Sequence, residues 1–359
     1  MMQSSLISSL FRKEVQALSA YKVADAKGLI KLDAMENPYS WPEELKNQWV
    51  EELKDCELNR YPDPEARLLA DTLRIHDAIP ECCDILLGNG SDEIIQMLLM
   101  ALTPGAAVLS TTPSFVMYRQ ISLSLGLYFH GIALQDDFGL DVPAMLAAIA
   151  QHQPAVIFLA YPNNPTGNLF EAEAVHRIIK ASSGLVIIDE AYAPFADASF
   201  MAQLANYDNL LVMRTLSKMG LAGLRLGYLM GHPDLIQQLN KIRLPYNINI
   251  LSQVSAKFAL THPTVFDTQS QMICKHRRHV FEQLSGIPEI TAYPSSANFI
   301  LFRTPLDQAD SIFSAIKQQG VLIKNLSAQG GLLRDCLRVT VGTETENEAF
   351  INALQNSLR

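Results

Sequence analysis

Seven short apolar runs, each ending in a turn or a polar signal, constrain the fold of this chain more than any other feature. They are DILLGNG (84–90), AAVLSTTP (106–113), LYFHGIAL (127–134), AVIFLAYP (155–162), LVIIDEAY (185–192), NLLVMRTLS (209–217) and GLRLGYLMG (223–231). Runs of this length that are rich in Val, Ile and Leu are typical of strands buried on both faces. Amphipathic segments such as EIIQMLLMAL and EAEAVHRIIKAS separate them. The alternation predicts an α/β fold with a mostly parallel seven-stranded sheet between helices.

The pattern changes after about residue 260. A long helical stretch precedes three expected strands, which lie in ITAYPSSANFILFRT, GVLIKNL and CLRVTVG, with helices between and after them. We therefore predict a large domain over residues 41–260 and a smaller α+β domain over residues 261–359. The first 40 residues are too few to fold alone. We expect them to form an N-terminal arm, residues 1–40, that packs on the small domain.

Composition and charge exclude several classes of protein. The net charge of −9 argues against a nucleic-acid binder, which needs a basic surface to displace counterions from phosphates. No apolar run approaches the roughly 18 residues that would indicate a membrane span, and the first residues lack the continuous apolar segment of a secretory signal. The five cysteines show no metal-binding spacing, and their scattered pattern fits a reducing compartment. We expect a cytoplasmic protein with no metal, nucleic-acid or membrane partner.

Polar residues follow the carboxyl ends of the predicted strands, where α/β sheets form their sites. One group is the turn Gly88-Asn-Gly90 and the helix start at Ser91 and Asp92. Free N–H groups and the positive end of the helix dipole favour a phosphate at such a start. A capped helix without a ligand is the commoner use of these residues.

Two further polar residues follow buried strands. Asp189 ends the apolar run Leu185-Val-Ile-Ile188, and a carboxylate there is costly to bury unless it has a positive partner. It is either a structural aspartate that caps the next turn or the counter-charge of a cationic ligand atom, such as a protonated ring nitrogen. Asn164 belongs to Asn164-Pro-Thr-Gly167, which is most often a turn, and it could also bind a ligand oxygen.

Lys218 follows another predicted strand, with hydroxyl groups at Thr215 and Ser217 and a glycine-rich segment that ends in Arg225. A solvated surface lysine is the ordinary interpretation of this residue type. A buried lysine beside a cation instead has a lowered pKa, and its neutral amine can attack a carbonyl. Arg225 would supply that cation and a bidentate phosphate contact. An aldehyde cofactor with a phosphate and a basic ring nitrogen, pyridoxal 5′-phosphate (PLP), would use all of these groups.

With these residues, the chain resembles the fold-type I PLP-dependent aminotransferases, and among them most closely the histidinol-phosphate aminotransferases. The resemblance runs nearly end to end. The matching motifs are Glu36-Asn-Pro38, Asn59-Arg-Tyr-Pro62, Gly90-Ser-Asp-Glu93, Pro113-Ser-Phe-x-x-Tyr118, Pro162-Asn-Asn-Pro-Thr-Gly167, Asp189-Glu-Ala-Tyr192, Thr215-Leu-Ser-Lys218, Gly220-Leu-Ala-Gly-Leu-Arg225, Ser296-Ala-Asn-Phe299 and Cys336-Leu-Arg-Val-Thr-Val-Gly342. Lys218 and Arg225 are seven positions apart, one fewer than the commonest spacing in the superfamily, and we expect the turn at Met219-Gly220 to absorb the difference.

The resemblance implies a role for each polar residue. Lys218 would bind the cofactor covalently and then move a proton between the substrate Cα and the cofactor. Asp189 would keep the pyridinium nitrogen protonated. Asn164 and Tyr192 would hydrogen-bond the ring 3-oxygen, and Phe115 would stack on the ring. The cofactor phosphate would be bound by Ser91, Asp92, Thr215, Ser217 and Arg225.

The same resemblance implies a homodimer with shared active sites. Tyr61 would reach the cofactor phosphate of the partner subunit, and the N-terminal arm would also pack on that subunit. The catalytic residues would be Lys218, Asp189 and Tyr192.

Substrate binding is implied by the resemblance at further positions. Arg338 would bind the phosphate of histidinol phosphate in one half-reaction and a carboxylate of glutamate or 2-oxoglutarate in the other. Tyr21 and Lys324 fall where a tyrosine and a second cation assist it, although many relatives have arginine at the second position. An ammonium holds phosphate as a point charge, without bidentate geometry. Asn37 and Asn164 complete the expected substrate contacts.

The implied reaction is transamination between L-histidinol phosphate and 2-oxoglutarate, a step in histidine biosynthesis. An aromatic amino-acid aminotransferase and an amino-acid-phosphate decarboxylase of the same fold are the alternatives within this enzyme class. A PLP-binding regulatory module without catalysis and a plain structural protein are the alternatives outside it.

Overall fold

The carboxyl ends of the strands of one large sheet organise this molecule. The structure is a computed structural model, and it describes residues 6, 8–20 and 23–359. The sheet has the order β2-β8-β7-β6-β5-β3-β4. Its strands are β2 (Asp84–Gly88), β3 (Ala107–Thr112), β4 (Tyr128–Ala133), β5 (Val156–Ala160), β6 (Leu185–Asp189), β7 (Leu210–Thr215) and β8 (Gly227–Gly231). All seven strands lie within the seven predicted runs, so the predicted α/β fold is confirmed.

The sheet is parallel except at β8, which pairs antiparallel with both β7 and β2. This reversal has a consequence for the site. The amino end of β8 lies at the same edge of the sheet as the carboxyl ends of β6 and β7, since Thr215 is paired with Gly227. The segment that leads into β8 therefore joins the residues that follow the parallel strands.

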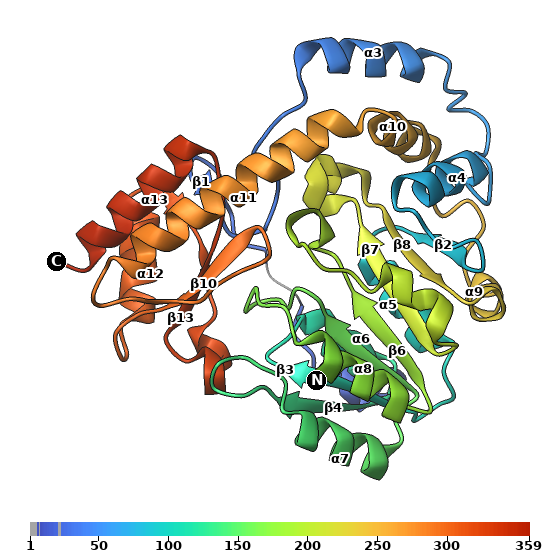
Figure 1. Ribbon diagram of the computed structural model, residues 1–359, viewed down its shortest axis with the longest axis horizontal. Coiled ribbons are helices and arrows are strands. Elements are labelled where there is room, and N and C mark those ends of the chain that lie inside the picture. Colours follow the sequence, from blue (N-terminus) through green and yellow to red (C-terminus); the bar gives the residue numbers. More distant parts are fainter. Residues whose placement is uncertain (1–5, 7, 21–22) are drawn as a thin grey trace.

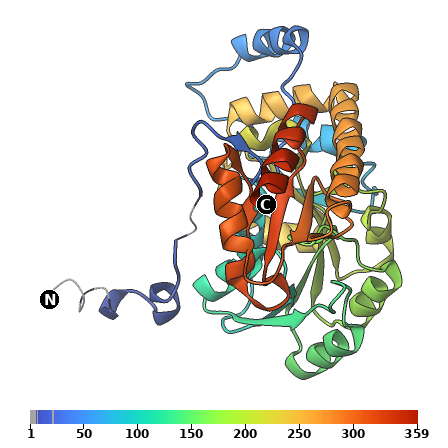
Figure 2. The ribbon, with the colours of Figure 1, turned by 90° about the vertical axis from the view of Figure 1, so that its left-hand side faces the viewer.

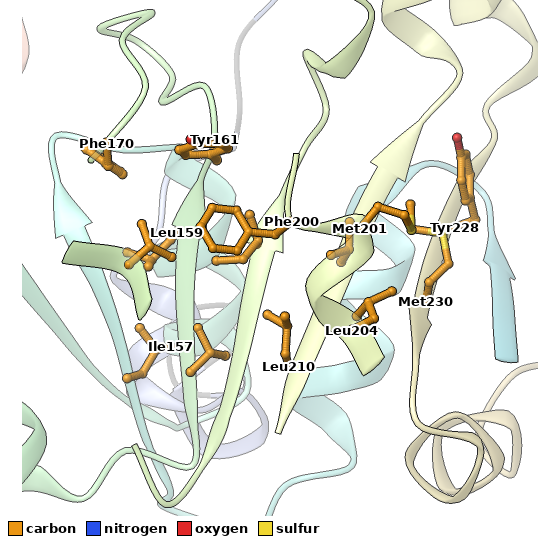
Figure 3. Close-up of a cluster of buried hydrophobic side chains, with 14 of the residues drawn as sticks. Ile157, Leu159, Tyr161, Phe170, Phe200, Met201, Leu204, Leu210, Tyr228 and Met230 are labelled. Atoms are coloured by element: carbon orange, nitrogen blue, oxygen red, sulfur yellow. The ribbon is translucent and has the colours of Figure 1, made fainter. Parts of the chain in front are cut away.

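Two apolar cores cover the two faces of the sheet. In β5, Ile157 and Leu159 belong to one core, whereas Val156 and Phe158 belong to the other. This period of two places successive side chains on opposite faces. Figure 3 shows part of the first core. Ile157 and Leu159 of β5 belong to the same cluster as Leu210 of β7 and as Phe200 and Met201 from the segment between β6 and β7. Burying each such aliphatic side chain stabilises the fold by roughly 1.5–3 kcal/mol.

Helices supply the other half of each core (Figure 1). The first core contains side chains of α4 (Arg67–His76), α7 (Val142–His152), α8 (Ala172–Ala181) and α10 (Ile250–Leu260). The second contains side chains of α5 (Ser91–Met100), α6 (Val116–Ser124) and α9 (Pro233–Asn240). The helix α3 (Glu43–Lys54) lies outside both layers and packs on α10.

A second group of elements follows α11 (Pro263–Ser285), the long helix that runs from the large sheet to the smaller one in Figure 1. The small antiparallel sheet has the order β12-β13-β10-β9. Its strands are β9 (Thr291–Ala292), β10 (Phe299–Arg303), β12 (Lys324–Asn325) and β13 (Cys336–Thr340). It shares an apolar core with the end of α11, α12 (Ala309–Gln318) and α13 (Glu344–Ser357).

Two of the three strands expected in this region are divided. Pro294 lies between β9 and β10, and proline cannot donate to a strand ladder. In GVLIKNL, β11 (Val321–Leu322) pairs with β1 (Ile30–Lys31), whereas β12 pairs with β13. The chain changes partner at Ile323, which a continuous apolar run does not reveal.

The N-terminal segment touches both parts of the chain. The strand β1 lies beside β11, and the short helix α2 (Lys13–Gln16) contacts α6, where Arg12 donates to the carbonyl of Ser124. Figure 2 shows this segment, drawn in dark blue, projecting from one side of the molecule. The domain limits at about residues 40 and 260 stay a prediction. Among the helices of the described residues, none combines the length and the apolar character that crossing a membrane requires.

Adjacent residues at the ends of β6 and β7 face opposite sides of the sheet. Asp189 and Thr215 line a cavity on one side, whereas Glu190 and Arg214 form a buried ion pair on the other. Arg214 also pairs with Asp77 at 3.1 Å, and Glu190 accepts hydrogen bonds from Ser199 and from the Phe200 N–H. This network fixes the strand ends that carry the cavity residues.

Removal of Arg214 tests how strongly this network holds the fold. Arg214→Met leaves two buried carboxylates without their shared cation, so we expect the free energy of unfolding to fall by about 3–5 kcal/mol. The matched control is Arg67→Met, which breaks the exposed pair with Asp63 and should cost about 0–1 kcal/mol. Urea unfolding followed by circular dichroism measures both values. Equal losses would contradict a structural role for the Arg214 pairs.

Candidate active site

A cavity of about 360 Å³ opens at the carboxyl edge of the large sheet. It is lined by side chains that follow β2, β3, β5, β6 and β7 and by the segment before β8. Ten of the sequence-predicted residues line it: Ser91, Asp92, Phe115, Asn164, Asp189, Tyr192, Thr215, Ser217, Lys218 and Arg225. These residues are spread over more than a hundred positions, and the parallel strands bring them to one edge.

Asp189 lies at the base of the cavity and is almost fully buried. Its Oδ2 accepts a hydrogen bond of 2.5 Å from the Tyr118 hydroxyl, and its Oδ1 accepts one of 3.1 Å from the Ala191 N–H. Burial raises the pKa of the Asp189 carboxyl to about 6, and the Tyr118 and Ala191 bonds act against this rise. The two donors favour the ionised carboxylate, which a cationic partner would stabilise further.

Lys218 lies in a π-helical turn, Ser217–Leu221, in which Gly220 has the positive φ of 123°. Its Nζ lies 5.8 Å from the centre of the Tyr192 ring and 3.5 Å from the Ala34 carbonyl oxygen. Burial of the amine, followed by the nearby Arg338 guanidinium, lowers the pKa of Lys218 to about 8. The sequence pointed to Arg225 as the neighbouring cation. Arg225 also lowers this pKa, but Arg338 contributes more.

Arg225 and the start of α5 form a cationic end of the cavity. The helix begins after Gly90, which offers no side chain to cap its free N–H groups. The Arg225 Nη1 lies 3.4 Å from the Ser217 hydroxyl, which also accepts a hydrogen bond from Thr215. Gly90 has a φ of 82°, which favours glycine, and a Cβ atom there would lie 2.7 Å from Arg225 Nη2, so the guanidinium would have to shift. These donors surround a space that suits an anion.

Arg338, on β13, brings a second cation to the site from the small sheet. Its Nη1 donates to Asn164 Oδ1 and its Nη2 donates to the Asp33 carbonyl at 3.2 Å. The other end of the Asn164 amide donates to the Tyr192 hydroxyl at 3.0 Å. Lys324 is directly opposite Arg338 in the antiparallel register, and such paired residues project from the same face of a sheet.

Among the residues that the structure describes, four predicted site residues do not belong to the lining of this cavity: Arg338, Lys324, Tyr61 and Asn37. Tyr61 is 81% exposed and stacks on Tyr246 of its own chain, with ring centres 4.5 Å apart. The Asn37 amide donates to the Met219 carbonyl and to Gln269, and thus holds the turn beside Lys218. Tyr21 lies outside the described residues. The expected contact of Asn37 with the substrate stays a prediction.

Two contributors were not singled out from the sequence. Tyr118 appears there only as the last residue of Pro113-Ser-Phe-x-x-Tyr118, yet it binds Asp189 directly. The carbonyl oxygens of Asp33 and Ala34 accept hydrogen bonds from Arg338 and Lys218, respectively. Carbonyl contacts of this kind depend on chain direction rather than on residue type, so a sequence carries no signal for them.

Comparison with known proteins agrees with this geometry. The family model described as aminotransferase class I and II matches residues 27–354. Histidinol-phosphate aminotransferase 2 of Nitrosococcus oceani is 60% identical over 355 residues, which cover 99% of each chain. Histidinol-phosphate aminotransferase 2 of Cupriavidus pinatubonensis is 48% identical and covers 99% of this chain and 98% of its own.

A solved structure agrees with the fold. The crystal structure of histidinol-phosphate aminotransferase from Sinorhizobium meliloti, in complex with PLP, superposes with a TM-score of 0.87 over 98% of both chains at 22% identity. Fold, site and sequence similarity lead to one assignment. The chain belongs to the class I and II aminotransferases and, within them, to the histidinol-phosphate aminotransferase family.

Proposed function

We propose that this protein transfers the amino group of L-histidinol phosphate to 2-oxoglutarate, with PLP as its cofactor. The products are imidazole acetol phosphate and L-glutamate, in a step of histidine biosynthesis. The observation that carries the proposal is the arrangement of three charged groups in one cavity. The cavity is lined by the Lys218 amine, by the buried carboxylate of Asp189 and by the Arg225 guanidinium at its cationic end.

The residues present fit PLP. Its phosphate matches the uncapped start of α5 with Arg225 and the hydroxyl groups of Thr215 and Ser217, because such donors bind phosphate. Its ring nitrogen matches Asp189, a buried carboxylate without a cationic partner among its hydrogen-bond donors. The PLP-bound structure from Sinorhizobium meliloti adds support through its shared fold.

When bound, PLP supplies an aldehyde that condenses with amines and a ring that accepts the electrons of the substrate Cα–H bond. The protein supplies the groups that hold and move protons. Asp189 keeps a negative charge beside the ring nitrogen. The Lys218 amine would move a proton between the substrate Cα and the cofactor. Because burial lowers the pKa of Lys218 to about 8, more of the amine is neutral near pH 7 than in an ordinary lysine.

Arg338 binds the anionic end of the substrate in both half-reactions. It is almost fully buried, so the interaction with an incoming phosphate or carboxylate is only weakly screened by solvent. A guanidinium can hold either group through two parallel hydrogen bonds. Lys324 on the neighbouring strand adds positive charge on the same face of the sheet, which favours the phosphate of histidinol phosphate.

The active unit is a homodimer with shared sites. Tyr61 is an aromatic side chain exposed on the surface and held in place by stacking on Tyr246. Together with Tyr246, which is 40% exposed, it forms a small contiguous aromatic patch that a partner surface can cover. A second copy of the chain would cover the pair and receive the Tyr61 hydroxyl at its own cofactor phosphate.

Substrate preference is tested by an absorption titration of the purified protein loaded with PLP. We expect the band of the loaded protein to convert to that of the aminated cofactor at low concentrations of histidinol phosphate. Conversion by L-phenylalanine should require far higher concentrations, because that substrate lacks the phosphate that Arg338 and Lys324 bind. Arg338→Ala should weaken the binding of both histidinol phosphate and glutamate.

Three other outcomes would each point away from the proposal. An equal response to both amines would indicate a broad aromatic aminotransferase. Release of CO₂ from an amino-acid phosphate, without conversion of the cofactor, would indicate a decarboxylase. A loss confined to one substrate in Arg338→Ala would mean that the two anions bind at separate places.

The lowered pKa of Lys218 predicts the pH dependence of its reactivity in the cofactor-free protein. Because the folded value is below that of a free lysine, the neutral amine forms as the pH rises through about 8. Labelling by trinitrobenzenesulfonate, quantified at the Lys218 peptide by mass spectrometry, should be half-maximal near that pH. Lys218→Ala identifies the peptide. A midpoint near the ordinary lysine value of about 10.4 would exclude the activated amine.

The shared site is tested by mixing two defective variants. Lys218→Ala should abolish turnover, and Tyr61→Ala should impair it by weakening the phosphate contact. After the two are reassorted, each heterodimer has one site with a native Lys218 and a native Tyr61, so activity should recover to about one quarter of the wild-type value. Each variant reassorted with itself is the control. A mixture no more active than the mean of the two self-reassorted controls would rule out sites shared in this way.

A further inference from the structure

Tyr118 is a fully buried tyrosine whose hydroxyl points at the base of the active site. Its ring stacks on Phe158 of β5, with centres 4.5 Å apart and planes 7° from parallel. Phe115 packs against its edge at 5.5 Å. The only hydrogen bond that its hydroxyl makes among the described residues is the 2.5 Å bond to Asp189 Oδ2. The side chain is thus fixed by apolar contacts and directed by one polar contact.

The origin of this placement lies in the packing of α6. The helix begins after Phe115, directly beyond the carboxyl end of β3, and its inner face joins the core that contains Phe158. Tyr118 is in the first turn of α6, so its ring enters that core close to the strand ends. Ser122, one turn later, donates to the Tyr118 carbonyl and lies in the same buried face.

Asp189 is held at both of its oxygens. The Ala191 N–H binds Oδ1 from the turn that follows β6, and Tyr118 binds Oδ2 from the opposite side of the cavity base. Two donors on different oxygens fix the plane of a carboxylate, whereas the backbone donor alone would leave it free to rotate. The orientation of this carboxylate decides where a ring nitrogen can approach.

We propose that Tyr118 is a positioning residue, which holds the Asp189 carboxylate in the orientation and charge state that the cofactor ring nitrogen requires. This inference rests on the proposed PLP-dependent function. Tyr118 acts through Asp189 and does not line the cavity. The Ala191 N–H cannot take the place of the Tyr118 hydroxyl, because it already donates to the other carboxylate oxygen.

The charges around Asp189 explain why this donor matters. Burial raises the pKa of the carboxyl, and the negative charges of Asp92 and Glu190 raise it further. Tyr118 and the Ala191 N–H are the two donors that oppose this rise. Without the hydroxyl, Asp189 holds its proton up to a higher pH, and one buried oxygen loses its partner. A protonated Asp189 cannot serve as a counter-charge.

Tyr118→Phe tests the proposal, because it removes the hydroxyl and keeps the ring packing on Phe158. We expect the affinity for PLP to fall by about tenfold or more, as for the loss of a hydrogen bond to a buried charge. The acid limb of PLP binding against pH should also shift to higher pH. Fluorescence titration of the cofactor-free variant with PLP at a series of pH values measures both effects.

Tyr161→Phe is the matched control. Tyr161 is another buried tyrosine, placed directly after β5, but its ring packs against Phe200. Removal of the Tyr161 hydroxyl should leave the affinity for PLP and the acid limb of PLP binding unchanged. Thermal unfolding of both cofactor-free variants reports any general loss of stability, which a positioning role does not require.

A double-variant cycle separates positioning from a structural effect. In the Asp189→Asn background, Tyr118→Phe should have little further effect on PLP affinity, because the group that it orients has lost its charge. An equal loss in both backgrounds would overturn the proposal, and so would wild-type affinity with an unshifted acid limb in Tyr118→Phe alone. If the wild-type protein itself fails to bind PLP, the proposed function fails instead, so the two failures are distinguishable.

Discussion

The burial of the Asp189 carboxylate is the constraint on which the site depends. Val186, Ile187 and Ile188 of the same strand are wholly inaccessible to solvent, so the chain ends an apolar strand with a group that water would otherwise stabilise. Desolvating such a charge costs several kcal/mol unless partners compensate. Tyr118 and Ala191 supply part of this compensation. No cation of the described residues is among its hydrogen-bond donors, and the ring nitrogen of the proposed cofactor would supply the positive charge that completes the compensation.

Sheet topology then decides which residues can surround that carboxylate. Parallel pairing of β5, β6 and β7 brings the segments after them to one edge. The reversal at β8 matters as much, because its amino end lies at that edge. Arg225 precedes β8 and therefore returns to the segment that follows β7, beside Ser217. A sheet that was parallel throughout would place Arg225 at the opposite edge, away from the helix start at Ser91.

The large sheet and most of the cavity could be predicted from the sequence because both follow from local patterns. Buried strands read as apolar runs, and polar residues at their ends are visible against that background. The connection of Tyr118 to Asp189 was not predictable in this way, because an aromatic residue on an apolar helix face reads as core. Its hydroxyl becomes meaningful only when the packing of α6 on β5 is known. The division of the small-sheet strands depends equally on tertiary partners, since β11 leaves the ladder to pair with β1.

The neighbouring acids Asp189 and Glu190 have different surroundings, because one faces the cavity and the other takes part in a structural ion pair. Strand alternation sends them to opposite faces, and the same alternation separates Thr215 from Arg214 on β7. Glu190 and Arg214 satisfy each other on the far side, together with Asp77. Because those charges are paired, the strand ends are held rigidly without using any group of the cavity. Neither Lys218 nor Asp189 takes part in that network. Burial on the cavity side lowers the pKa of Lys218 to about 8 and raises that of Asp189 to about 6.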